Sequence, residues 1–266
     1  MNRFTRSISR LCSYVSLSDY KYIPTNPKFV IGYATKFAVI TSICYIWLVL
    51  LDRAFPQALF PFSLNDIWES KGNLVDWLTL GLPLFLWGIA IASVNAAIFT
   101  CYSASQNARA GQHFFWGLCI SVVAGFFEEI LYRWIYFYLS IISVKLSNFC
   151  FLGFIGLPII KWLHVYISGP IFNLLTFGQL KTWLVNPDIW FVGSALLVVN
   201  AKFRDGHAYQ GIWGLLNSWV LGFFLFRVAL SHGLLAAIVV HFFYDALIFT
   251  IESVDRLVGL LREKTK

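Results

Sequence analysis

Residues 234–251 read LLAAIVVHFFYDALIFTI, an apolar stretch interrupted only by His241 and Asp245. A helix needs about 20 consecutive apolar residues to cross a bilayer, and this stretch is close to that length. An ionisable side chain at the centre of such a helix costs about 2.5–3.5 kcal/mol on insertion scales, so its presence needs a reason. The stretch therefore predicts a helix that lies within a membrane and carries two functional candidates.

The composition of the whole chain supports a membrane protein. Of its 266 residues, 59% are apolar and 12% are charged, whereas soluble domains have about 25% charged residues. So few charges cannot make a water-soluble surface around so much apolar area, and a bilayer supplies the second apolar solvent. The composition excludes a disordered chain, a disulfide scaffold and an ordinary soluble enzyme. The five cysteines form no CxxC or metal-finger pattern.

Several further apolar stretches are long enough to cross a membrane. They are residues 30–51, 78–100, 114–142, 183–199 and 212–230. Two shorter stretches, 149–162 and 165–180, contain Gly and Pro and form either two short helices or one long helix with a re-entrant piece. We expect an all-α polytopic membrane helix bundle with about eight transmembrane helices.

The distribution of positive charge predicts the orientation in the membrane. Basic residues gather before the first apolar stretch and after the last one: Arg3, Arg6, Arg10, Lys21, Lys28, Arg256, Arg262, Lys264 and Lys266. Cytoplasmic flanks carry such an excess, so both termini are expected in the cytoplasm, which requires an even number of crossings. The net charge of +7 is explained in this way without nucleic acid. The expected parts are a cytoplasmic segment (1–29), a transmembrane domain (30–251) and a cytoplasmic basic tail (252–266).

The stretch 114–142 is interrupted by Glu128, Glu129 and Arg133. Glu129 and Arg133 are spaced i, i+4 and can form an ion pair on one helix face. Glu128 lies about 100° around the helix, without this partner. An unpaired, buried carboxylate is suited to act as a general base. The alternative is a structural cluster of charges at the water interface.

Histidines supply the other candidates. His241 and Asp245 are also spaced i, i+4, so the carboxylate can orient the imidazole, or both can bind a water or a metal ion. The alternative is a structural pair. Phe203 and His207 belong to a polar sequence that, taken alone, is typical of a solvated loop. His164 lies at a predicted span end, where an interfacial histidine is common.

Taken together, the three patterns EExxxR (Glu128, Glu129, Arg133), FxxxH (Phe203, His207) and HxxxD (His241, Asp245) resemble the CAAX-protease and bacteriocin-processing (CPBP) family. This family of intramembrane proteases includes the type II CAAX prenyl endopeptidase. The sequence GLLAAI at residues 233–238 is also similar to the family's lead into its last motif. The resemblance covers about residues 122–249, the expected catalytic core, with residues 143–190 as an insertion.

The resemblance implies an intramembrane endopeptidase that hydrolyses a peptide bond of a membrane-associated protein or peptide. In it, Glu128 and His207 activate a water, His241 and Asp245 stabilise the oxyanion or complete a water or metal site, and Glu129 and Arg133 hold the helix. Two alternatives stay open for the cofactor: a zinc ion on Glu128, His207 and His241, or a metal-free mechanism. His164, preceded by Ile160, is a rival for the second motif, but Phe203 favours His207.

The expected location is the bacterial plasma membrane, as a multi-pass protein. The expected partners are a membrane protein or peptide substrate and the lipid bilayer, and no nucleic acid. One alternative is a non-catalytic scaffold, immunity or partner-binding protein of the same family. Another is a transporter with a proton relay through Glu128, His241 and Asp245, although the chain shows no internal symmetry of the kind that transporters have.

Overall fold

The computed structural model describes residues 27–55, 59–99 and 110–264, and within these ranges all regular structure is helical. The all-helical prediction is thus confirmed for this part of the chain. The predicted N-terminal segment (1–29) lies almost entirely outside it. The long helices are α2 (Pro27–Ala54), α3 (Leu74–Phe99), α4 (Ala110–Glu128), α5 (Phe137–Cys150), α9 (Trp190–Gly206), α10 (Gly211–His232) and α11 (Leu234–Lys264).

Shorter elements connect the long helices. Two are π-helical, η3 (Glu129–Tyr136) and η5 (His164–Ser168). Three are 3-10 turns, η1 (Asp66–Trp68), η4 (Gly153–Ile155) and η6 (Ala208–Gln210). The remaining short helices are α6 (Ile159–Leu163), α7 (Gly169–Leu175) and α8 (Lys181–Leu184).

Four helices in the described part of the chain are long and apolar enough to cross a membrane: Thr35–Ala54, Leu74–Val94, Gly211–His232 and Leu234–Asp255. These four helices support the membrane class. The predicted count of eight crossings is not confirmed. The stretch 114–142 contains three charged residues, and residues 149–180 divide into short helices. The stretch 183–199 is split, because α8 ends at Leu184 and α9 begins at Trp190.

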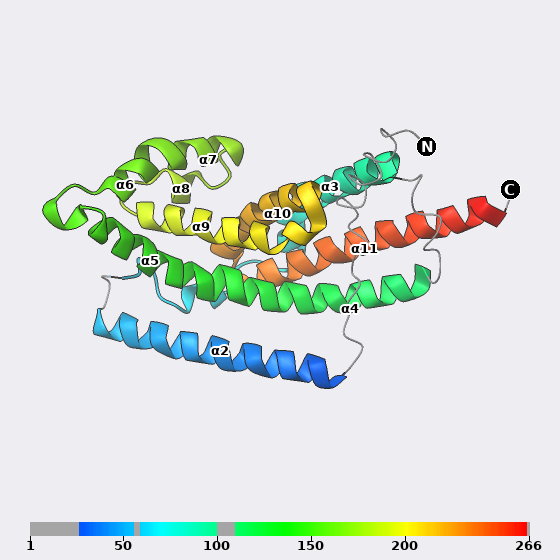
Figure 1. The fold of residues 1–266 in the computed structure, drawn as a ribbon, viewed down its shortest axis with the longest axis horizontal. Helices are drawn as coiled ribbons and strands as arrows, with labels where there is room; N and C mark the ends of the chain where they lie inside the picture. Colours follow the sequence, from blue (N-terminus) through cyan, green and yellow to red (C-terminus); the bar gives the residue numbers. More distant parts are fainter. Residues whose placement is uncertain (1–26, 56–58, 100–109, 265–266) are drawn as a thin grey trace, which may run out of the picture.

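The helix that carries the two glutamates runs through the centre of the molecule. Helix α4, the π-helical segment η3 and α5 follow one another without a break, and Figure 1 shows them as one long element. Helix α11 packs along α4 and α3, while α9 packs along α5 and α10. Helix α2 lies on the outer side, where the Tyr45 ring is 5.2 Å from the Trp134 ring. The π-helix places a local widening at the glutamates, as is frequent at functional sites.

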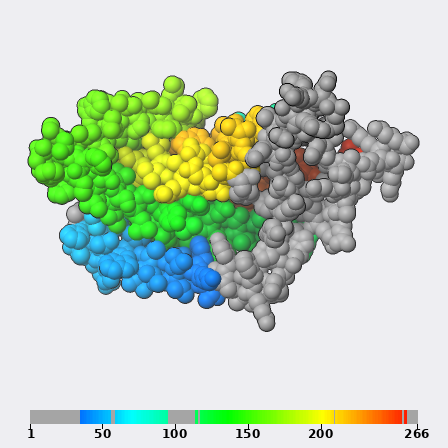
Figure 2. Space-filling view, in the orientation of Figure 1, coloured from blue at the N-terminus to red at the C-terminus, as the bar shows by residue number. Residues whose placement is uncertain are grey.

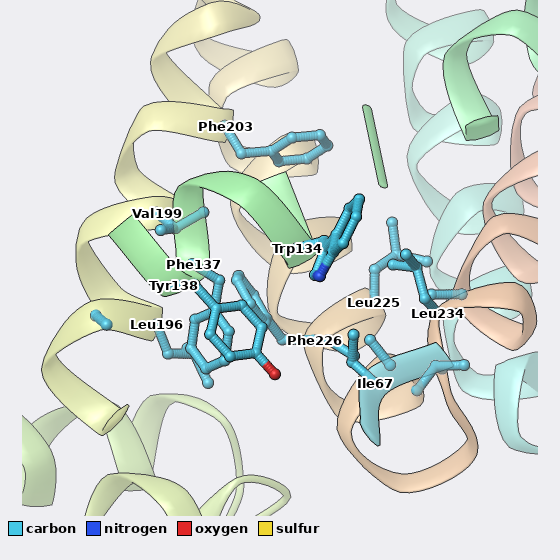
Figure 3. Close-up of a cluster of buried hydrophobic side chains, with 14 of the residues drawn as sticks. Ile67, Trp134, Phe137, Tyr138, Leu196, Val199, Phe203, Leu225, Phe226 and Leu234 are labelled. Carbon is cyan, nitrogen blue, oxygen red and sulfur yellow. The ribbon is translucent and has the colours of Figure 1, made fainter. Parts of the chain in front are cut away.

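A buried aromatic cluster holds this central helix in place. The Trp134 indole N–H donates to the carbonyl of Leu64 at 3.1 Å, and the Tyr138 hydroxyl donates to the carbonyl of Ser63 at 2.9 Å. The connection between α2 and α3 is thereby tied to η3 and α5. Buried side chains from five segments surround these contacts in Figure 3: Ile67, Trp134, Phe137, Tyr138, Leu196, Val199, Phe203, Leu225, Phe226 and Leu234.

Helices α4 and α11 approach closely at Gly125. A Cβ atom at this position would lie 3.1 Å from the carbonyl oxygen of Ile238 and 3.3 Å from the backbone nitrogen of Phe242. Backbone atoms of a packed helix cannot move aside as a flexible side chain can. The close approach therefore depends on glycine, and it sets the distance between the two helices that carry the first and third motifs.

We expect Gly125→Leu to lower the free energy of unfolding by about 1–3 kcal/mol, because the added side chain overpacks the contact between α4 and α11. Denaturation of the purified protein in detergent measures the change. Val122→Leu is the matched control, since Val122 is exposed on the same helix and its replacement should change stability by less than about 0.5 kcal/mol. Equal stability of the two variants would contradict the close approach.

Candidate functional site

The structure brings the six predicted site residues into two neighbouring groups of contacts, one of four residues and one of two. Nη1 of Arg133 is 3.2 Å from Oε1 of Glu129, and the same oxygen accepts a hydrogen bond from Nδ1 of His241 at 2.8 Å. Nε2 of His241 is 3.6 Å from Oδ2 of Asp245. Nε2 of His207 is 3.8 Å from Oε2 of Glu128. Residues 128–133, the end of α9 and the middle of α11 thus meet.

The centre of this group is fully buried. The side chains of Glu129 and Arg133 both have an exposed fraction of 0%, which confirms the predicted i, i+4 ion pair. The Arg133 guanidinium also lies over the Phe203 ring, 4.1 Å from its centroid, and donates from Nη2 to the carbonyl of Gly222 at 3.4 Å. This ion pair connects the π-helical segment to α9, α10 and α11.

Glu128 differs from Glu129 in exposure and in partners. Its side chain is 30% exposed, yet its Oε2 atom is buried and has no hydrogen-bond partner among the described residues. A buried polar atom without a partner is unusual in a folded protein and calls for an explanation, such as a water molecule. The 3.8 Å distance to Nε2 of His207 is too long for a direct hydrogen bond.

His207 is held in a defined orientation by the first residue of its motif. Nδ1 of His207 donates to the carbonyl of Phe203 at 2.8 Å. In the neutral ring this hydrogen bond leaves Nε2 as an acceptor, directed towards Glu128. The polar sequence at residues 203–207 is therefore the last turn of α9 and not the solvated loop that such a sequence suggests. Phe203 thus contacts both groups, because its ring packs against the Arg133 guanidinium and its carbonyl accepts the hydrogen bond from His207.

His241 is enclosed by carboxylates on both sides. Nδ1 faces Glu129 and Nε2 faces Asp245, so a protonated ring can donate both of its N–H groups. The His241–Glu129 contact joins residues 112 positions apart, and helical periodicity cannot predict it. Its neighbour Asp245 has an exposed fraction of 21%. This end of the group therefore faces outward, as Glu128 does.

Among the described residues, no group of three or more His, Cys, Asp or Glu side chains is placed to hold a metal ion. The hydrogen bond between Nδ1 of His241 and Glu129 is of the kind that orients a metal-ligating histidine, and it leaves Nε2 available. Both alternatives for the cofactor, a zinc ion or a metal-free mechanism, therefore stay open.

The rival histidine, His164, lies in a different environment. It is buried in η5, with Nε2 3.0 Å from the carbonyl of Leu184 and Nδ1 3.3 Å from the hydroxyl of Ser168. These contacts tie η5 to the segment around α8. His207, and not His164, is the histidine that faces Glu128.

The hydrogen bonds of Asn217, which lie close to the site, were not predicted from the sequence. The amide oxygen of Asn217 accepts hydrogen bonds from the Tyr244 hydroxyl at 2.6 Å and from the Trp87 indole N–H at 3.1 Å. These bonds join α3, α10 and α11 one residue away from Asp245. A lone asparagine in an apolar stretch was the available signal, because amides in membrane helices commonly bond across helices.

Comparison with protein-family models, with curated proteins and with solved structures finds no match for this chain. The resemblance to the CPBP family therefore rests on the motif residues alone.

Proposed function

We propose that this chain is an intramembrane endopeptidase of the CPBP type. It hydrolyses a peptide bond of a membrane-associated protein or peptide with a water activated by Glu128 and His207. One observation carries the proposal: Glu128 is partly exposed, has a buried oxygen without a hydrogen-bond partner among the described residues, and faces an oriented His207 at 3.8 Å. A structural ion-pair cluster needs only the buried Glu129–Arg133–His241 group and does not explain this pair.

The proposed reaction begins with a water between Glu128 and His207. Nε2 of His207 accepts a hydrogen bond from the water and orients it, and the Glu128 carboxylate takes its proton. The water oxygen then attacks the carbonyl carbon of the substrate, and the carbonyl oxygen becomes negatively charged. Glu128 returns the proton to the leaving amine as the C–N bond breaks. This proton balance needs no group beyond the chain's own residues.

His241 and Asp245 supply the electrostatic part of the mechanism. A protonated His241 places positive charge beside the site and can direct its Nε2–H towards the developing oxyanion. Asp245, 3.6 Å from that nitrogen, orients the ring from the outer side. Glu129 fixes the inner side of the ring through Nδ1. Because Glu129 and Asp245 hold the His241 ring in a fixed orientation, the ring needs little reorganisation during the reaction.

The proposal includes a cellular setting. The four apolar helices are compatible with a multi-pass membrane protein, and the site lies on helices that belong to this apolar bundle. A bacterial plasma membrane with both termini in the cytoplasm accounts for the basic residues at the two ends of the sequence. The corresponding substrates are proteins or peptides that reach the site from the bilayer.

The experiment compares the N-termini of membrane proteins by mass spectrometry in cells that produce either the natural chain or Glu128→Gln at equal levels. We expect new N-termini with the natural chain only, and these identify the substrates. Identical N-termini, together with a cellular phenotype that Glu128→Gln preserves, would contradict the protease and favour the non-catalytic scaffold, immunity or partner-binding protein.

A further inference from the structure

The chain between α5 and α9 leaves and re-enters the bundle at the same end. Nζ of Lys145, near the end of α5, lies 3.8 Å from the centroid of the Phe191 ring at the start of α9. Figure 1 shows α5 and α9 side by side and running in opposite directions. Residues 151–189, here called the α6–α8 hairpin, therefore begin and finish at one end of the molecule.

The inner face of the α6–α8 hairpin is tightly docked on the bundle. The Phe172 ring lies 5.6 Å from Trp219 and 6.1 Å from Phe223 of α10. Within the hairpin, Nε2 of His164 lies 3.0 Å from the carbonyl of Leu184. Gly193 on α9 permits close approach, because a Cβ atom there would lie 2.5 Å from the carbonyl oxygen of Trp183. These contacts hold the hairpin in one position, so its outer face is a fixed surface.

The outer face is apolar and exposed. Its exposed side chains include Leu174, with an exposed fraction of 76%, and Phe177, with 90%. The other members are Trp162, Tyr166, Ile171 and Leu175. Figure 2 shows this part of the chain at the upper left edge of the molecule, with no other segment over it in that view. Soluble proteins rarely leave so large an apolar surface in water.

Beyond Lys161, the helical arm and the turn at the tip of the hairpin contain no charged side chain. Residues 162–180 contain no Asp, Glu, Lys or Arg, and this stretch is bounded by Lys161 and Lys181. Lysines at the two ends of an apolar segment are typical anchors at the boundary between hydrocarbon and water. Lys161 lies near the start of the arm that leads to the tip. Lys181 follows the turn directly, with its N–H bonded to the carbonyl of Gly178 at 3.2 Å, so its long side chain has to extend towards the headgroups.

The turn at the tip satisfies its own backbone. The N–H groups of Thr176, Phe177, Gly178 and Gln179 donate to the carbonyls of Phe172, Leu174, Asn173 and Thr176 at 2.8–3.0 Å. Hydrocarbon offers no hydrogen-bond partner, so a turn inside a bilayer must pair its polar groups internally or with the protein. Phe177 and Gly178 adopt positive φ angles of 51° and 72°, and this conformation turns the chain while the Phe177 side chain points outward.

The hairpin is too short to cross the membrane. The apolar helix Ile159–Leu175 has seventeen residues and would extend about 25 Å if it were straight. A bilayer has a hydrocarbon core of about 30 Å, and the chain then returns to the end from which it came. An element of this length with an uncharged tip can enter the hydrocarbon core and leave on the same side.

The geometry points to a re-entrant hairpin whose outer face binds the acyl chains of membrane lipids. Phe177 lies at its tip, and Lys161 lies at the interface. We choose the bilayer as the partner of this face because the helices that are long enough to span a membrane also expose apolar side chains, and the same lipid can cover both surfaces. The chain between α5 and α9 therefore makes no crossing. This inference does not depend on the proposed hydrolysis.

Site-directed spin labelling of the purified full-length protein in phosphatidylcholine–phosphatidylglycerol vesicles tests the inference. Single cysteines replace Phe177, Leu174, Lys161 or Asp188 in a variant whose five native cysteines are serine, and circular dichroism checks that each variant is folded. We expect labels at 174 and 177 to collide with oxygen dissolved in the lipid and not with a water-soluble nickel complex. Unlabelled cysteines at 161 and 188 should react with an impermeant thiol reagent from the same side of the vesicle.

Two results would overturn the inference. Access of the nickel complex to both 174 and 177 would show that the outer face lies in water and awaits a protein partner instead of lipid. Labelling of 161 and 188 from opposite sides would show that the segment crosses the membrane. Position 174 on α7 and position 177 in the following turn give independent readings, so failure of one variant to fold still leaves a decisive measurement.

Discussion

Glu128→Gln is expected to lower the rate of peptide hydrolysis by about 10²–10⁴-fold, the usual contribution of a general base. Glutamine keeps the size and polarity of the side chain but cannot accept a proton from water. The variant should fold normally, since Glu128 is partly exposed and does not belong to the buried ion pair. The measurement is the initial rate of cleavage of a substrate identified in cells, with purified variants in detergent or vesicles.

The control for this prediction is Asp205→Asn. Asp205 also bears a carboxylate near the second motif, but it is exposed and paired with Arg204 at 2.6 Å, so its removal should leave the rate nearly unchanged. Because Glu128 and His207 are proposed to act on one water, His207→Gln and the double variant should be as slow as Glu128→Gln. Independent, multiplying losses would contradict a shared water, and an active Glu128→Gln would contradict the base.

The local contacts of the site could be predicted from helical periodicity. Glu129 with Arg133, and His241 with Asp245, are neighbours on one helix face at a spacing of four residues, and the structure shows both contacts. The contact between His241 and Glu129 depends on how α11 packs against α4, which no local pattern encodes. The approach of His207 to Glu128 followed only from a resemblance to a family whose motifs occur in the same order.

The number of crossings was harder to predict, for a physical reason. Hydropathy measures whether a segment prefers lipid, and residues 149–180 do so without being long enough or straight enough to cross. Short helices, a π-helical segment and a turn at Phe177 divide this stretch. The stretch 114–142 was also counted as a crossing, but Glu128, Glu129 and Arg133 lower its hydropathy, and it is not among the four helices of the described chain that are long and apolar enough to cross. In both cases tertiary packing decides where polar and apolar groups lie.

Arg133→Met is expected to lower the free energy of unfolding by about 3–5 kcal/mol, the usual cost of removing one partner of a buried ion pair. The loss leaves Glu129 with a buried negative charge that only His241 offsets. Methionine fills much of the space between the Phe203 and Phe226 rings, and sulfur packs well against aromatic rings. The destabilisation should therefore come from charge and not from a cavity. Denaturation in detergent, followed by circular dichroism, measures it.

A second substitution separates these causes. In Glu129→Gln/Arg133→Met no buried charge lacks a partner on this helix, and the amide oxygen of residue 129 can still accept the hydrogen bond from Nδ1 of His241. We expect the double variant to regain most of the lost stability, as replacement of both members of a buried pair often does. The matched control is Arg204→Met. Its exposed pair with Asp205 should contribute less than about 1 kcal/mol.

The same double variant distinguishes stability from catalysis. If Glu129 and Arg133 only position the site, a folded Glu129→Gln/Arg133→Met protein should retain measurable hydrolysis, reduced through a less well oriented His241. A double variant as unstable as Arg133→Met would show that packing around the guanidinium, and not its charge balance, holds η3 in place. A stable double variant as inactive as Glu128→Gln would show that Glu129 itself takes part in the reaction. Stability and rate, measured on the same samples, therefore assign separate functions to two adjacent glutamates.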